Sequence, residues 1–438
     1  MKKKSVWAIL AACLALGLGL GFTAKVRAGA ASREAAMIRP VDDAWRAALP
    51  RDPEQATAAY LARISPEARG RSDAYFTGGY WLQLGSFLVT LGSFGLLLAT
   101  GASAAMREFA ERATRRRPLQ TMLYAVLFMA ATWVIQLPLG VAGDFIREHR
   151  YGMATQSFPH WMKDQVVGLL VSTVILALAL AALYGALRRF PRTWWIWGTG
   201  GGVLVLAFVM FIAPAFIDPL FNAYKPLPEG PARQAILSLA RANGVPAKDV
   251  LWFDASRQTN RVSANVSGIL GTTAVRLNDN LLNRSTLPEI KGVMAHELGH
   301  YVLNHLYKAL MFFALVLLAG FAFVAWAFEA LRSRAGSWGI RDIGDPAGLP
   351  LLAGLFTLFM FVLTPALNTD TRVQETEADL FGVNASLEPD GFAEAQLKLV
   401  EYRKADPGPV EEFLFFDHPS PRKRILTAMR YKAEHFPR

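Results

Sequence analysis

Three of the chain's seven histidines lie within VMAHELGHYVLNHL, residues 293–306. His296 and His300 are four residues apart, so on a helix their imidazoles leave the same face and can bind one metal ion. Glu297 is turned by about 100° from His296, so its carboxylate can reach a water at the ion without binding the metal. This H-E-x-x-H spacing predicts a zinc ion that activates water for hydrolysis. The alternative is a helix with solvated histidines. His305 lies off the metal-facing side and is expected to cap or pack.

A catalytic zinc needs a third protein ligand and an open position for water. The best candidates lie in TRVQETEADLFG, residues 371–382. Glu375 and Asp379 share a helix face, so one can bind zinc while the other orients a ligand histidine. Glu377 points away from that face and is expected to face solvent. The alternative for the whole cluster is a solvated acidic face.

The composition is that of a membrane protein. Hydrophobic residues make up 53% of the chain and charged residues 18%, against roughly 25% charged in ordinary globular chains. Seven apolar runs are near the length of about 20 residues that crosses a bilayer. They cover residues 5–23, 80–101, 120–142, 166–187, 195–217, 309–331 and 349–367. The sequence therefore predicts a mostly α-helical, multi-pass membrane protein with about seven spans.

The first apolar run has two interpretations. MKKK, the apolar stretch and KVRAGA together fit either a span or a cleavable signal peptide. LAAC, ending at Cys13, resembles a lipoprotein cleavage box, but the apolar run continues beyond it, so lipidation is not expected. Cys13 is the only cysteine, which excludes an intramolecular disulfide and a thiolate ligand near His296.

The net charge of +11 does not indicate nucleic-acid binding, because no aromatic-interleaved basic module accompanies it. Short basic loops explain it better: REFAERATRRRP (107–118) and RRFPRT (188–193) are typical of the cytoplasmic side of a membrane protein. With the amino-terminal lysines they place the amino terminus inside. If all seven spans are real, the long polar regions that follow the fifth and seventh spans then lie on the opposite face.

These two polar regions, residues 218–308 and 368–438, must dock together if they share a site. The predicted division is a membrane domain at 1–217 with a polar loop at 24–79, a first protease part at 218–308, two spans at 309–367 and a second protease part at 368–438. DVLWFDAS and TTAVRLNDNLL predict strands, and RQTNRVSANVSG between them a turn or irregular edge. A capping box of Thr286 and Glu289, with Pro288 in the first turn, starts the helix that carries His296 and runs almost directly into the sixth span.

Four motifs together resemble those of the type 1 CAAX prenyl proteases. They are HELGH before a span, ETEADLFG after the last span, FIDPLFNAYKPLPEG after the fifth, and DHPSPRKRI near the end. The likeness covers most of the chain and is weakest in the first hundred residues. That family consists of integral-membrane zinc metalloendopeptidases whose seven spans enclose a chamber. The resemblance implies an α+β zincin-like protease domain capping the helical bundle, with one zinc ion per chain.

The resemblance also implies roles for individual residues. In the family the glutamate of the E-x-x-A-D motif is the third zinc ligand, which selects Glu375 and leaves Asp379 to orient a ligand histidine. Segments like SANVSG and HPSPRKR line the substrate groove, which implies substrate binding by Asn265 and catalytic roles for His418 and Arg424. No family role transfers to residues 24–79. The catalytic domain of the eukaryotic relatives faces the cytosol, against the charge count here, so the orientation stays open.

The sequence therefore predicts a zinc metalloendopeptidase in a bacterial inner membrane, with Glu297 as general base and a prenylated or membrane-associated protein as substrate. One alternative is the same chemistry used for quality control of membrane proteins. The signal-like, lysine-led amino terminus favours it, because prenylated tails are not an expected substrate class in bacteria. The other alternative is a membrane scaffold with a structural zinc site, which would need four protein ligands and no general base.

Overall fold

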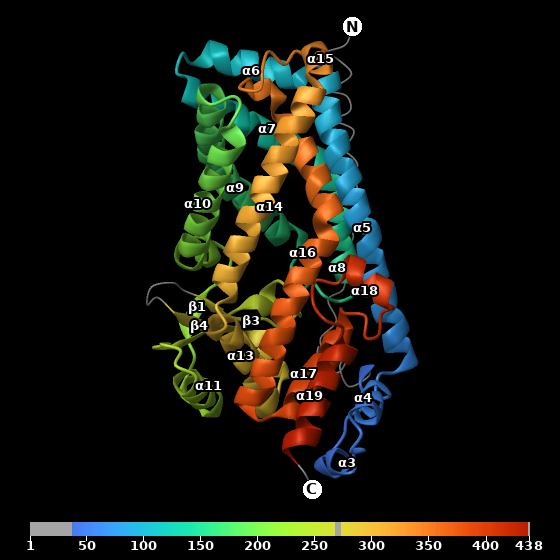
Figure 1. Cartoon of the computed structure of the whole chain (residues 1–438). Helices are drawn as coiled ribbons and strands as arrows, with labels where there is room; N and C mark the ends of the chain where they lie inside the picture. The colour runs from blue at the N-terminus through green and yellow to red at the C-terminus, as the bar shows by residue number, and fades with distance from the viewer. Residues whose placement is uncertain (1–36, 268–272, 437–438) are drawn as a thin grey trace.

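The computed structural model describes residues 37–267 and 273–436, which are mostly helical and include one four-stranded sheet (Figure 1). The helices are α3 (Asp43–Ala47), α4 (Pro53–Leu61), α5 (Pro66–Ala99), α6 (Ala102–Ala113), α7 (Arg117–Gly140), α8 (Glu148–Arg150), α9 (Phe158–Arg189), α10 (Trp194–Ile212), α11 (Pro231–Ala242), α12 (Asp279–Arg284), α13 (Leu287–Val302), α14 (His305–Ala330), α15 (Arg332–Ala335), α16 (Leu349–Ser386), α17 (Pro389–Lys398), α18 (Pro409–Phe415) and α19 (Pro421–His435). The strands are β1 (Tyr224–Pro226), β2 (Val250–Phe253), β3 (Ala264–Ser267) and β4 (Ala274–Asn278).

Within the described residues, six helical segments are long and apolar enough to cross a membrane. They are Pro66–Ala99, Arg117–Arg150, Phe158–Arg189, Trp194–Leu220, His305–Ala330 and Pro346–Ser386. These segments overlap the six predicted runs from residue 80 onwards, and the first predicted run, 5–23, lies outside the described residues. Large apolar side chains on the spans are exposed, including Trp81 at 72% and Phe208 at 61%, as expected for a surface that contacts lipid. The multi-pass helical fold is thus confirmed.

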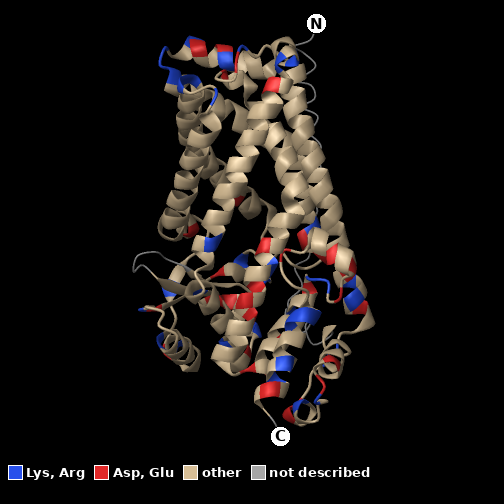
Figure 2. Cartoon of the chain, in the orientation of Figure 1, with Lys and Arg blue, Asp and Glu red and all other residues tan. Residues whose placement is uncertain are grey.

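Charged residues gather at the two ends of the bundle and are nearly absent between them (Figure 2). One end carries α6, α15 and the linkers at 114–116 and 190–193, and we call it the basic end. The other end carries α13, the sheet and the carboxy-terminal helices. Cavities of about 250 and 450 Å³ lie between the spans, both lined by Trp133 and Gln165. The spans therefore leave open cavities between them; the enclosed chamber that the resemblance implies stays a prediction.

Helix α16 joins the membrane part to the metal-binding part of the chain. It runs from Leu349 to Ser386 without a break, although Pro365 lies inside it and removes one backbone hydrogen bond. The sequence changes from apolar to polar near residue 367 because the same helix passes from the membrane part to the metal-binding part of the chain. Glu375 and Asp379 are held on the continuation of a membrane span.

The sheet has the strand order β1-β2-β4-β3, with β2 and β4 parallel and the other two pairs antiparallel. β2 and β4 confirm the two predicted strands. The stretch between them, which we expected to be a turn or irregular edge, contains the regular outer strand β3. It alternates apolar Ala264 and Val266 with polar Asn265 and Ser267, but only over four residues inside a polar stretch, so the pattern is too short to predict a strand. β3 and α11 pack against α13.

Helix α13 begins as predicted, with a capping box between Thr286 and Glu289. It ends at Val302, and a short turn connects it to α14. In this turn Asn304 adopts a left-handed conformation with φ of 58°. Asparagine tolerates this region better than most residues. The turn changes the direction of the chain, so His305 starts a new helix instead of continuing the face of α13.

The amino-terminal polar loop predicted at 24–79 is helical in its described part. It forms α3, α4 and the start of α5, which begins at Pro66 and continues into the span. α4 packs against α17 and α19. Tyr60 donates a hydrogen bond to Asp390 at 2.8 Å, and the buried ion pair between Arg63 and Glu394 measures 2.6 Å. This segment therefore braces the carboxy-terminal helices that surround the candidate metal site.

Candidate metal centre

His296 and His300 on α13 face Glu375 on α16, and their ligand atoms all lie within 4.8 Å of one another. The two Nε2 atoms are 3.1 Å apart, and they lie 3.3 and 3.4 Å from the Glu375 carboxylate oxygens. A tetrahedral zinc with bonds of about 2.0–2.1 Å holds its ligand atoms about 3.3 Å apart. One oxygen of Glu375, Oε2, is buried without a hydrogen-bond partner in the described part of the chain. The donor set, the spacing and this unpartnered oxygen fit a bound zinc.

A glycine lets the two helices approach this closely. A Cβ atom on Gly382 of α16 would lie 2.8 Å from the backbone nitrogen of His296 and 2.9 Å from its Cα. Contacts that short do not occur, so any larger residue would push α16 away from α13. Gly382 therefore sets the distance at which Glu375 meets the two histidines.

Asp379 holds the other side of His296. Its Oδ1 lies 2.9 Å from His296 Nδ1, and the side chain is almost fully buried. Arg424 donates to the same carboxylate through Nε at 2.8 Å and Nη2 at 2.5 Å. Burial alone would lower the pKa of His296, but the Asp379 and Glu375 carboxylates outweigh it and raise the pKa to about 9. Asp379 thus lies where a carboxylate fixes the orientation of a ligand histidine.

His300 is held by residues that the sequence analysis did not assign to the site. Its Nδ1 lies 2.8 Å from Nδ1 of the buried His305, whose Nε2 lies 3.0 Å from Glu377 Oε2. Lys308 donates to the same oxygen at 2.7 Å. We expected Glu377 to face solvent, but its half-exposed carboxylate is paired. The sequence signal that could have predicted this contact is His305 itself, a third histidine five residues after the H-E-x-x-H motif.

Glu297 has a half-buried carboxylate. Throughout the described ranges it makes no hydrogen bond or ion pair, in contrast to Glu375 and Asp379 nearby. Burial raises the pKa of Glu297 above the ordinary glutamate value, and His296 and His300 only partly offset this. A free carboxylate with a raised pKa is suited to accept a proton near neutral pH.

The remaining predicted residues occupy different positions around the site. His418 lies between α18 and α19, with Nε2 3.4 Å from Glu375 Oε1 and Nδ1 2.9 Å from Asp417. Arg424 is buried and bound to Asp379. Asn265 is exposed on the outer strand β3, which packs against α13. The structure therefore brings His418 and Arg424 to the ligand cluster and leaves Asn265 on the neighbouring strand.

Two family descriptions match the chain: "CAAX prenyl protease N-terminal, five membrane helices" over residues 51–223, and "Peptidase family M48" over residues 226–432. The chain is 32% identical over 338 residues to the uncharacterized metalloprotease YhfN of Bacillus subtilis, covering 76% of this chain and 79% of that protein. It is 26% identical over 336 residues to CAAX prenyl protease 1 of Saccharomyces cerevisiae, covering 72% and 73%.

The fold is similar to that in the crystal structure of S. mikatae Ste24p. The TM-score is 0.71 at 21% sequence identity, and the likeness covers 83% of this chain and 89% of that chain. The family matches span both the membrane helices and the part that holds the ligand cluster. The chain therefore belongs to peptidase family M48 and is a membrane metalloprotease of the CAAX prenyl protease type.

Proposed function

We propose that the protein is a zinc metalloendopeptidase that holds one zinc ion between His296, His300 and Glu375. Zinc bound there would lower the pKa of water toward neutrality and polarise a peptide carbonyl. The observation that carries the proposal is the free carboxylate of Glu297 beside a three-residue ligand set. A structural zinc site would use four protein ligands and would leave Glu297 without a role.

Glu297 acts as the general base and then as the general acid. Its carboxylate takes a proton from the attacking water and later delivers it to the leaving amine. His418 stabilises negative charge on the substrate oxygen, since its Nε2 reaches the cluster at Glu375. Arg424 acts through Asp379, because its guanidinium is engaged by that carboxylate.

Two chains of hydrogen bonds orient the ligand histidines. With Nε2 of both rings directed at the cluster, His296 donates its Nδ1 proton to Asp379. His300 donates its Nδ1 proton to His305, and His305 donates its Nε2 proton to Glu377. Each ligand histidine is therefore fixed by a carboxylate, directly in one case and through a second imidazole in the other.

The substrate is a membrane-associated polypeptide that binds between the outer strand β3 and the spans. Asn265 on the open edge of β3 holds the substrate backbone extended. A cavity of about 380 Å³ is lined by Asp417 and Pro419, the neighbours of His418, and by aromatic residues. These are Tyr75, Phe76, Tyr80, Tyr402, Phe415 and Phe416. Arg147, Arg261 and Arg403 also line it, so a segment with an apolar or lipid-modified side chain next to a carboxylate suits this lining.

Relatives named CAAX prenyl protease 1 favour a carboxy-terminal, prenylated tail as substrate. The relative in Bacillus subtilis supports a bacterial membrane, where clearance of membrane proteins is the competing use of the same residues. Cleavage sites mapped on prenylated peptides and on unfolded membrane proteins distinguish the two. Cuts confined to prenylated tails favour the first use, and cuts spread through loops favour the second.

Glu297→Gln tests the proposed chemistry. We expect this variant to retain one zinc per chain and to lose hydrolysis by about 10²- to 10⁴-fold, the usual contribution of a general base. The control is Glu434→Gln, an exposed change in α19. Chelation should abolish activity and zinc should restore it. Full activity of Glu297→Gln, or activity restored only by a different metal, would contradict the proposal.

A further inference from the structure

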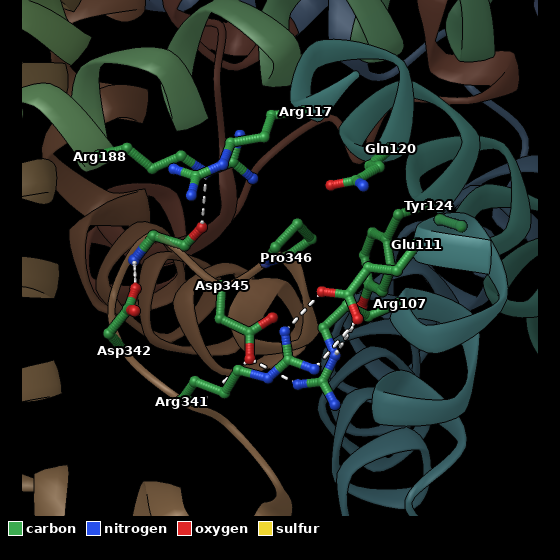
Figure 3. A pocket seen from close by; sticks show the side chains of 12 residues that line it. Arg107, Glu111, Arg117, Gln120, Tyr124, Arg188, Arg341, Asp342, Asp345 and Pro346 are labelled. Carbon is green, nitrogen blue, oxygen red and sulfur yellow. Dashed lines mark hydrogen bonds and ion pairs between the residues drawn. The ribbon is translucent and has the colours of Figure 1, made fainter. Parts of the chain in front are cut away.

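A second polar site lies at the basic end, at the opposite end of the spans from the metal cluster. It is a cavity of about 160 Å³ between α6, the start of α7, the end of α9 and the segment at 341–346 (Figure 3). One water occupies roughly 30 Å³ in the liquid, so the cavity has room for a polar group of several atoms. Its lining includes four arginines and three acidic residues.

Two of these arginines are neutralised by carboxylates. Arg107 and Asp345 form an ion pair of 2.7 Å whose side chains are 7% and 3% exposed. Arg341 donates to both carboxylate oxygens of Glu111, at 2.5 and 3.0 Å. These pairs form one wall of the cavity and leave little net charge on it.

The other two arginines, Arg117 and Arg188, lack carboxylate partners. Arg188 donates only to neutral acceptors, the Gly344 carbonyl oxygen and the Thr121 hydroxyl, each at 3.1 Å. The side chain of Arg117 makes no hydrogen bond or ion pair within residues 37–267 and 273–436. The charge of Arg117 acts against the charge of Arg188, and both side chains line the cavity in Figure 3. An anion bound between them would remove that repulsion.

Asp342 is the remaining acidic residue of the lining. Its carboxylate accepts a hydrogen bond from the Gly344 amide at 2.7 Å and lies beyond ion-pair distance of any cation in the described part of the chain. It therefore offsets part of the positive charge without occupying the space between Arg117 and Arg188. The cavity keeps a net positive charge.

The surroundings place this cavity at the membrane boundary. Arg117 and Arg189 are the first and last residues of two spans. Next to them the apolar side chains of Leu119, Phe190 and Trp197 are 45%, 39% and 58% exposed, and the last two stack with ring centroids 5.2 Å apart. Tryptophan at such a level is typical of the interface between headgroups and hydrocarbon.

Further basic residues lie beside Arg117 and Arg188 in the sequence. They are Arg115, Arg116, Arg189 and Arg192, all exposed and, among the described residues, without an ion pair. Clusters of arginine immediately outside a span attract anionic lipids, at about 1 kcal/mol for each residue near the surface. These arginines and the cavity therefore add positive charge to the same ends of the two spans.

We propose that this cavity binds the phosphate group of an anionic membrane lipid between Arg117 and Arg188. Guanidinium groups match phosphate oxygens with paired N–H donors. The lipid's acyl chains remain in the surrounding hydrocarbon, next to the exposed apolar side chains. This site is independent of the metal centre and of the proposed hydrolysis.

The test is a titration of the full-length, zinc-loaded protein in neutral detergent with phosphatidylglycerol, with bound lipid counted by native mass spectrometry. We expect Arg117→Gln to weaken binding at least about fivefold, which corresponds to about 1 kcal/mol. Arg117→Lys keeps the charge but loses the paired donors, so its loss should be smaller. Phosphatidylcholine, which carries no net charge, should bind more weakly than phosphatidylglycerol.

Arg334→Gln is the matched control, because Arg334 is exposed at the same end, has no ion pair within the described ranges and lies outside the cavity. It removes the same charge, so an equal loss in both variants would show general surface attraction and overturn the proposal. Inorganic phosphate at millimolar concentration is the second arm. If phosphate alone binds more tightly than phosphatidylglycerol and depends on Arg117 in the same way, the ligand is free phosphate and not a lipid. Zinc content should be unchanged in every variant.

Discussion

His300 Nδ1 lies 2.8 Å from Nδ1 of His305, which belongs to a different helix. Because His305 in turn contacts Glu377, we expect His305→Ala and Glu377→Gln each to weaken zinc binding by about 10- to 100-fold, the usual loss when a partner of a ligand histidine is removed. The measurement is the zinc dissociation constant from chelator competition, which does not depend on turnover.

Asp370→Asn is the control for Glu377→Gln. Asp370 lies on the same helix and accepts a hydrogen bond from Gln374 at 2.7 Å. Wild-type zinc affinity in Glu377→Gln would show that the contact between Glu377 and His305 does not support the metal site. Loss of affinity in Asp370→Asn as well would show that any acidic change on α16 disturbs the site.

Asp379→Asn should weaken zinc binding and also destabilise the fold. The first effect follows from its contact with His296, about 10- to 100-fold. The second follows from Arg424, whose buried guanidinium would lose its carboxylate, a change that costs up to about 3–5 kcal/mol. Chemical denaturation and zinc competition measure the two effects separately.

The double variant Asp379→Asn with Arg424→Met separates these roles. Replacing Arg424 removes the unpaired buried charge, so the free energy of unfolding should recover in part. The zinc affinity should stay low, because His296 still lacks its carboxylate. Recovery of both quantities together would mean that Asp379 serves only to pair Arg424.

The cluster of His296, His300 and Glu375 could be predicted in part because its spacings lie within single helices. His296 and His300 are one turn apart on α13, and Glu375 and Asp379 are one turn apart on α16. Helical periodicity alone brings each pair to one face. The choice of Glu375 as third ligand came from the family motif, and the structure places it with the two histidines.

The contacts between helices could not be predicted. His305 reaches His300 only because Asn304 turns the chain between α13 and α14, and Glu377 reaches His305 only because α16 packs beside α14. Arg424 contacts Asp379 across 45 positions of sequence. No local pattern encodes such distances. The strand β3 was missed because its alternation of apolar Ala264 and Val266 with polar Asn265 and Ser267 covers only four residues within a polar stretch.

The affinity for zinc should fall as the pH falls below about 9. In the metal-free protein the Asp379 and Glu375 carboxylates outweigh burial and raise the pKa of His296 from 6.5 to about 9. Zinc requires neutral imidazole, so below the raised pKa a proton competes with the metal. Between pH 9 and pH 7 the dissociation constant should rise by about 50-fold. A histidine with an ordinary pKa would give no change in this window.

Asp379→Asn supplies the control for this pH dependence. The change removes a carboxylate that raises the pKa of His296. The zinc affinity of Asp379→Asn should therefore begin to fall at a lower pH than the zinc affinity of the wild type. Isothermal titration calorimetry in buffers of different ionisation enthalpy counts the protons released per zinc. The same proton release in both proteins at pH 7.5 would contradict the assignment to His296.

Gly382→Ala tests whether close contact between α13 and α16 sets the geometry of the ligand cluster. The added Cβ would lie 2.8 Å from the His296 backbone nitrogen, so the two helices must move apart. Overpacking of this kind costs about 1–3 kcal/mol, and the movement carries Glu375 away from the histidines. We expect lower stability and weaker zinc binding.

Gly354→Ala on the same helix is the matched control, because its Cβ would meet Phe94 at an ordinary 3.6 Å. Alanine there should leave zinc binding unchanged and stabilise the helix by up to about 1 kcal/mol. If Gly382→Ala binds zinc as tightly as Gly354→Ala, the separation of the two helices does not control the site.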